Sequence, residues 1–154
     1  MCMIIREAKK EDYDSCIEIA KDLSEWFDAK EIEEISNNLL IYPTFVLEEE
    51  RVQAFAILQN KSDDTVEIKH FAVARNRQHR GLGTKLIRYI EEEYKGKDYI
   101  EVKTLDASAD YAPYVYTRAF YVKNGFVKTE VIDSYPGWEP GNPCAVYVKK
   151  ILSQ

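Results

Sequence analysis

The residues best suited to bind a ligand form one segment in the middle of the chain, FAVARNRQHRGLGTKL, from Phe71 to Leu86. It contains the end of a strand, a basic loop, two glycines at spacing two and the start of a helix. The first amides of a helix have no acceptor within it, and the helix dipole adds partial positive charge there. Glycines let the backbone approach an anion without a Cβ in the way. The segment therefore favours a phosphate-like ligand, and the alternative is an ordinary strand–loop–helix junction.

Three nucleotide-binding patterns do not fit this segment. Gly83-Thr84-Lys85 is only superficially similar to the end of the Walker pattern GxxxxGK[ST]. The dinucleotide-binding pattern needs a third glycine where this chain has Leu86, and its strand belongs at the start of the chain. A protein kinase loop belongs to a far longer chain. The pattern thus favours a diphosphate ligand outside these classes.

Length and composition predict one domain over residues 1–154, with 45% apolar and 31% charged residues and a net charge of 21 − 27 = −6. An acidic chain is a poor match for nucleic acid. The apolar runs are too short for a bilayer and the first residues do not resemble a signal peptide, so we expect no membrane partner and a cytoplasmic location. Cys2, Cys16 and Cys144 lack metal-ligand spacing, which predicts reduced thiols and no metal site.

Apolar periodicity predicts the elements that position the segment. Helices are expected over 13–23, 29–39, 81–96 and 111–124, and strands over 3–6, 44–47, 52–58, 66–73, 99–104, 126–132 and 145–151. The order β-α-α-β-β-β-α-β-α-β-β indicates a mixed α/β or α+β domain with helices on both faces of a sheet.

The motif Gln78-His79-Arg80-Gly81-Leu82-Gly83 resembles the (Arg/Gln)-x-x-Gly-x-(Gly/Ala) motif of the GNAT superfamily of acetyl-CoA-dependent N-acetyltransferases. Phe71–Val73 is similar to the strand before that motif, and Phe120–Phe126 is similar to the family's Tyr-x-x-x-Gly-Phe motif. The resemblance covers nearly the whole chain. It implies a mixed, mostly antiparallel sheet of six to seven strands, splayed between the fourth and fifth strands.

The resemblance also implies acetyl-CoA as co-substrate. Backbone amides of the turn would hold the coenzyme pyrophosphate, and the preceding strand would face the pantetheine arm and the acetyl carbonyl. The residues expected to bind the coenzyme are Phe71, Ala72, Val73, Gln78, His79, Arg80, Gly81, Leu82, Gly83 and Thr84.

Tyr121 matches the tyrosine that many family members use as general acid toward the coenzyme sulfur, with core packing as the alternative role. For the general base, the candidates are Glu67 and Glu101, on the strands expected to flank the cleft. Glu101 is preferred because similar enzymes that acetylate protein amino termini carry a glutamate in a comparable position. Both glutamates are alternatively solvated surface residues. His70 titrates in a useful range unless it is buried or hydrogen bonded.

One departure from the family pattern concerns the coenzyme arm. Many members have Asn seven residues before the acid tyrosine and Ala four before it, where this chain has Tyr114 and Thr117. The acceptor side carries Trp26-Phe27-Asp28 and Tyr135–Glu139, in which aromatics stand beside carboxylates and suit an ammonium group. Their structural alternatives are packing between helices and, for the second segment, anchoring of a hairpin or a homodimer contact.

The sequence therefore predicts an enzyme that moves an acetyl group from acetyl-CoA directly to a primary amine of a small molecule or peptide. No covalent enzyme intermediate is required, so Cys16 and Cys144 need not act as nucleophiles. The alternative is a non-catalytic acyl-CoA-binding or interaction domain with the same fold.

Overall fold

The computed structural model describes residues 2–151. The helices are α1 (Tyr13–Asp22), α2 (Ala29–Leu39), α3 (Leu82–Glu93) and α4 (Pro113–Lys123), with short 3₁₀ turns η1 (Lys10–Asp12) and η2 (Arg75–Arg77). The strands are β1 (Ile4–Glu7), β2 (Thr44–Glu49), β3 (Arg51–Asn60), β4 (Thr65–Val73), β5 (Tyr99–Leu105), β6 (Val127–Ile132) and β7 (Cys144–Lys150). This order is the one that the apolar periodicity predicts.

The seven strands follow the order β1-β2-β3-β4-β5-β7-β6, in which β4 and β5 run parallel and the pairs β1–β2, β2–β3, β5–β7 and β6–β7 are antiparallel. The fold is thus α/β with a mixed sheet flanked by helices, as expected. The chain divides into two compact units, Met1–Gln59 with Ile68–Tyr94, and Asn60–Glu67 with Lys95–Gln154. The units interleave in sequence because the β3–β4 hairpin tip belongs to the second unit.

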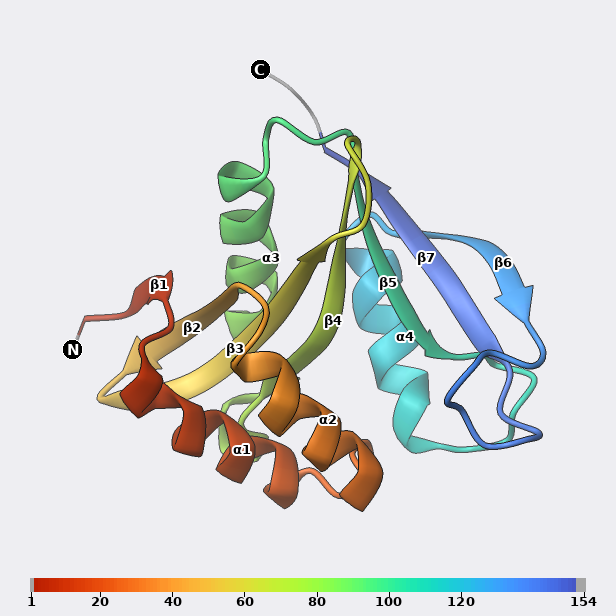
Figure 1. Cartoon of the computed structure of the whole chain (residues 1–154), viewed down its shortest axis with the longest axis horizontal. Helices are drawn as coiled ribbons and strands as arrows, with labels where there is room; N and C mark the ends of the chain where they lie inside the picture. Colours follow the sequence, from red (N-terminus) through yellow and green to blue (C-terminus); the bar gives the residue numbers. More distant parts are fainter. Residues whose placement is uncertain (1, 152–154) are drawn as a thin grey trace. The chain divides into compact units, whose positions relative to one another are not determined.

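In the first unit, helices cover both faces of the sheet (Figure 1). On one face, α1 and α2 pack through Cys16, Ile35 and Leu39 against Val46 and Phe55. On the other face, the ring of Phe45 meets Tyr89 of α3 edge-on at 5.4 Å. Neighbouring residues of β2 point to opposite faces of the sheet, so Phe45 packs toward α3 and Val46 packs toward α1 and α2.

In the second unit, β7 lies between β5 and β6, and α4 packs on β5. The register pairs Val102 with Tyr147 and Lys103 with Val146. The unit also holds the start of β4, so Glu67 of that strand can reach side chains of β5. This placement decides which candidate residues meet.

Two helix boundaries differ from the prediction. α4 begins at Pro113 instead of residue 111, because proline fits the first turn of a helix, where its missing N–H costs nothing. α3 ends at Glu93 with Tyr94 as its cap, so Gly96 lies beyond the helix and does not adopt the left-handed cap conformation. The periodic pattern located both helices but not their terminal turns.

The start of α2 offers a test of local stability. Oδ1 of Asp28 accepts a hydrogen bond from the Glu31 amide at 2.8 Å. Replacing Asp28 with Ala leaves that amide without its cap and is expected to lower the free energy of unfolding by about 0.5–2 kcal/mol. Urea denaturation of the variant and of Asp28→Asn, which keeps a capping oxygen, measures the effect. Equal stability of all three proteins would show that the cap contributes nothing.

Candidate functional site

The turn before α3 has the geometry of an anion-binding site. His79 and Gly81 both adopt positive φ, 63° and 83°, and Gly81 is the residue that precedes the helix. The first intrahelical bond runs from the Lys85 amide to the Gly81 carbonyl at 3.1 Å. The amides of Leu82, Gly83 and Thr84 therefore have no acceptor within the helix and are available to a ligand. A non-glycine residue at positive φ is also typical of backbone held strained for function.

The side chain of Gln78 closes the loop before this turn. Its Nε2 donates to the Val73 carbonyl at 3.0 Å, which fixes the end of β4 relative to the turn. In this structure, the side chain of Gln78 thus shapes the loop, and its backbone amide remains for a ligand. Phe71, Ala72 and Val73 form the last residues of β4, as the sequence predicts.

The arginines of the turn differ in how far their charge is already compensated. Arg75 donates to both carboxylate oxygens of Glu25, at 2.9 and 2.7 Å, and to the Asp22 carbonyl at 2.6 Å. Arg77 lies 3.4 Å from Glu49. Within residues 2–151, no acidic side chain pairs with exposed Arg80. Arg80 is therefore the arginine of this turn whose charge an anionic ligand can use. The contacts of Arg75 with Asp22 and Glu25 had no signal in the sequence.

Tyr121 owes its position to the end of α4. The Phe126 amide bonds the Tyr121 carbonyl, the Gly125 amide bonds the Val122 carbonyl, both at 3.0 Å, and Gly125 has φ 91°. This is a Schellman cap, in which the residue after the glycine packs on the helix. The rings of Tyr121 and Phe126 accordingly lie 5.4 Å apart. The Tyr-x-x-x-Gly-Phe spacing thus has a structural cause besides any chemical one.

The Tyr121 side chain is 5% exposed and also contacts the ring of Tyr147 at 6.4 Å. Burial raises the pKa of Tyr121, so its phenol stays protonated and can donate. No residue among 2–151 makes a hydrogen bond to its hydroxyl in this structure. The hydroxyl is therefore a donor without a protein acceptor.

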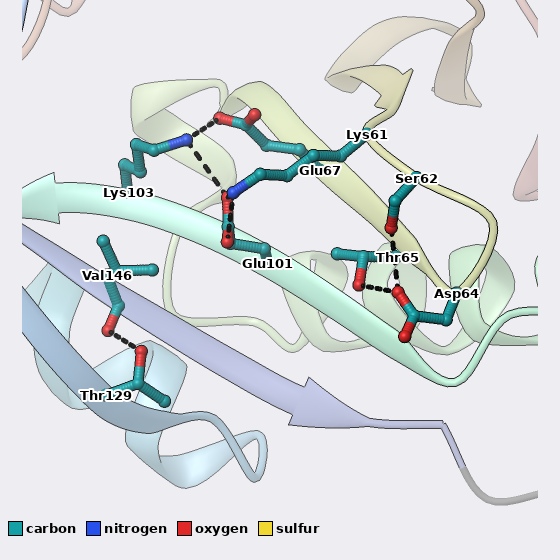
Figure 2. Close-up of polar contacts among 9 residues, drawn as sticks. All are labelled: Lys61, Ser62, Asp64, Thr65, Glu67, Glu101, Lys103, Thr129 and Val146. Atoms are coloured by element: carbon teal, nitrogen blue, oxygen red, sulfur yellow. Dashed lines mark hydrogen bonds and ion pairs between the residues drawn. The ribbon is translucent and has the colours of Figure 1, made fainter.

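Lys103 joins Glu67 and Glu101, and Lys61 contacts Glu101 as well, as Figure 2 shows. Lys61 Nζ lies 2.7 Å from each carboxylate oxygen of Glu101, and Lys103 Nζ lies 2.8 Å from Glu67 and 3.1 Å from Glu101. Burial disfavours the charge on Glu101, but the two lysines outweigh it and hold the pKa of Glu101 below its ordinary value. Both glutamates are thus held in ion pairs, and Glu101 is buried.

The sequence did not point to Lys103 and Lys61 as members of this cluster. A usable signal was the spacing Glu101-x-Lys103, because residues two apart on a strand share a face. Lys103 also lies under the ring of Tyr135 at 5.3 Å, and Tyr135 contacts Trp138 at 5.8 Å. The aromatic segment between β6 and β7 is therefore held against β5.

Other candidate residues have structural roles. Nδ2 of Asn38 lies 2.9 Å from Nε2 of His70, and burial lowers the pKa of His70 to about 4, so this histidine is neutral at pH 7. Trp26 and Phe27 pack against the core of the first unit. All three cysteines are free thiols, and burial raises the pKa of Cys16 to about 12 and of Cys144 to about 11.

Comparisons with known proteins identify the family of this chain and match its fold. A model of the acetyltransferase (GNAT) domain matches residues 41–128, more than half of the chain. The chain therefore belongs to the GNAT family of acetyltransferases. The matched range holds the turn, Glu67, Glu101 and Tyr121. A search of curated protein sequences finds no match.

Several solved structures share the fold over nearly their whole length. A Desulfovibrio desulfuricans protein assigned to the GNAT family aligns with a TM-score of 0.84 at 19% identity, over 98% of this chain and 100% of that one. The ribosomal-protein-S18-alanine N-acetyltransferase of Escherichia coli gives 0.75 at 20%, over 99% and 96%. A GNAT acetyltransferase of Elizabethkingia anophelis, solved with acetyl-CoA bound, gives 0.70 at 20%, over 96% and 97%.

Residues 2–151 contain neither a candidate metal-binding cluster nor a candidate membrane-spanning helix. No cluster of three or more His, Cys, Asp or Glu side chains has a geometry that would hold a metal ion. No helix among these residues has both the length and the apolar character that a bilayer crossing needs.

Proposed function

We propose that this chain is an N-acetyltransferase that uses acetyl-CoA to acetylate a primary amine of a small molecule or peptide. The observation that carries the proposal is the turn at 78–84, with unbonded amides at the start of α3, two left-handed residues and an arginine whose charge is not compensated. A diphosphate provides the oxygens that such amides bind. Support also comes from the E. anophelis relative, whose structure holds acetyl-CoA.

The side chains of this chain fit the proton movements of direct acetyl transfer. Acetyl-CoA supplies a thioester, and a C–N bond to the amine forms as the C–S bond breaks. Tyr121 gives a proton to the departing sulfur, and Glu101 or Glu67 accepts, directly or through water, the proton that the amine loses. The lowered pKa of Glu101 keeps this carboxylate ionised and therefore able to accept a proton, although it makes the carboxylate a weaker base.

One observation favours the second candidate, a non-catalytic acyl-CoA-binding domain. Both base candidates are engaged by lysines in this structure, with Lys61 contacting both oxygens of Glu101. A domain that only binds the coenzyme needs no free base.

A thiol-release assay with acetyl-CoA and a panel of amino acids, polyamines, aminoglycosides and peptides tests the proposal. We expect release above the rate of coenzyme hydrolysis with at least one class of primary amine, and a mass gain of one acetyl group on that amine. Coenzyme binding without release for any amine in the panel would favour the second candidate instead.

A further inference from the structure

Lys103 is the centre of the polar cluster in the second unit (Figure 2). Its ammonium contacts Glu67 of β4 at 2.8 Å, Glu101 of β5 at 3.1 Å and the ring of Tyr135 at 5.3 Å. We propose that Lys103 is a positioning residue for acetyl transfer, which holds in place the two base candidates and the loop 135–143 between β6 and β7, including the acceptor-side residues 135–139. This inference rests on the proposed function.

Burial distinguishes Lys103 from the other lysine of the cluster. The side chain of Lys103 is 12% exposed and that of Lys61 is 47% exposed. Lys61 can leave Glu101 for water and yield its place to the ammonium group of an acceptor. Lys103 cannot, because a buried ammonium that loses its carboxylates is strongly destabilised. Lys103 is therefore the fixed cation, and Lys61 is the exchangeable one.

The titratable groups in and around this cluster lie on the β3–β4 hairpin and on the strands of this unit. Lys61 lies on the β3–β4 hairpin, Glu67 on β4, and Glu130 and Cys144 on β6 and β7. The raised pKa of Cys144 keeps its thiol neutral at pH 7, and the two lysines balance Glu67 and Glu101. Removing Lys103 leaves two carboxylates facing one exposed cation. The charged form of Glu101 is then less favourable, so the pKa of Glu101 rises from its lowered value in the native protein.

Through its contact with Tyr135, Lys103 also holds the loop between β6 and β7 against β5. A cation over an aromatic face is attracted to the ring, and more strongly when the contact excludes water. Tyr135 in turn contacts the ring of Trp138, and the Trp138 amide donates a hydrogen bond to the Tyr135 carbonyl at 3.1 Å. Loss of Lys103 is thus expected to release the whole aromatic segment, while coenzyme affinity, which rests on the turn at 78–84, persists.

The test compares Lys103→Met, Lys103→Arg and Tyr135→Leu with the native protein. Three properties are measured: the pH profile of kcat/KM with the best amine of the panel, coenzyme A affinity by calorimetry, and amide hydrogen exchange over 133–143. For Lys103→Met we expect the acidic limb of the kcat/KM profile to shift to higher pH by about one unit. Amide hydrogen exchange over 133–143 should rise severalfold. Coenzyme A affinity should not change. Lys103→Arg keeps a positive charge and should keep the limb. Tyr135→Leu should raise exchange without moving the limb.

Lys128→Met is the matched control, because Lys128 also pairs with a buried carboxylate of this unit, that of Asp106 at 3.0 Å. The proposal is overturned if Lys103→Met moves neither the limb nor the exchange of 133–143, or changes both no more than Lys128→Met does. If the native protein acetylates no amine, the proposed function fails, and hydrogen exchange alone tests whether Lys103 holds the loop in place. A rise in exchange confined to 133–143 in Lys103→Met then supports that structural role of Lys103. Unchanged exchange refutes the structural role as well.

Discussion

Replacing Tyr121 with Phe is expected to lower kcat for acetyl transfer by about 10²- to 10⁴-fold, the usual contribution of a positioned general acid. The change removes only the hydroxyl. Within residues 2–151 that hydroxyl has no hydrogen-bond partner, and its ring sits among Phe120, Phe126 and Tyr147, which Phe can contact equally well. Coenzyme affinity and thermal stability should therefore stay at native values. Thiol release, calorimetry and thermal unfolding measure the three quantities.

Tyr147→Phe is the control for this variant, because Tyr147 is equally buried at 5% exposure and its ring lies 6.4 Å from Tyr121. It should retain native kcat. Since burial raises the pKa of Tyr121, the phenol should also give no alkaline limb below about pH 10. Full activity of Tyr121→Phe would assign this tyrosine to packing and leave the proton of the leaving thiol to another donor.

The second large effect is expected at the turn. Gly81 has φ 83°, and a Cβ built there meets no atom within 4 Å, so we expect Gly81→Val to act mainly through backbone strain. A left-handed conformation costs an L-residue about 1–2 kcal/mol, and more when it is β-branched. When the turn relaxes to relieve that strain, its amides no longer point toward a single anion position. Coenzyme A affinity should fall by about tenfold or more, measured by calorimetry.

Gly141→Val provides an unusually close control. Gly141 has φ 89° and equally free space, but it lies in the segment between β6 and β7. Both variants should lose similar stability, and only Gly81→Val should lose coenzyme affinity. Equal affinities for the two variants would mean that the conformation of the turn does not matter for the coenzyme.

The elements of the fold could be predicted because their apolar patterns are strong. The stripe of α3 is an example, since Leu82, Leu86, Ile87 and Ile90 are all buried as its spacing requires. Helix ends were less predictable, because they depend on single residues such as Pro113. Gly81 of the turn and Gly125 of the α4 cap were readable, since both adopt positive φ, a conformation that favours glycine.

The polar partners of the site could not be predicted. Lys61 and Glu101 are 40 residues apart in sequence, and Arg75 and Glu25 are 50 apart. Such pairs follow from strand order and register, which no local pattern encodes. The sequence therefore named Glu101 and Glu67 as bases without revealing that lysines hold both. The same limit applies to His70, whose partner Asn38 lies on α2.

Calorimetric titration of the native protein with coenzyme A and with pantetheine, which lacks the diphosphate and the nucleotide, tests the central claim most directly. If the amides at 78–84 hold the diphosphate, coenzyme A should bind at one site per chain and pantetheine should bind at least about a hundredfold more weakly. Equal affinity for the two compounds, or no uptake of coenzyme A, would contradict the account.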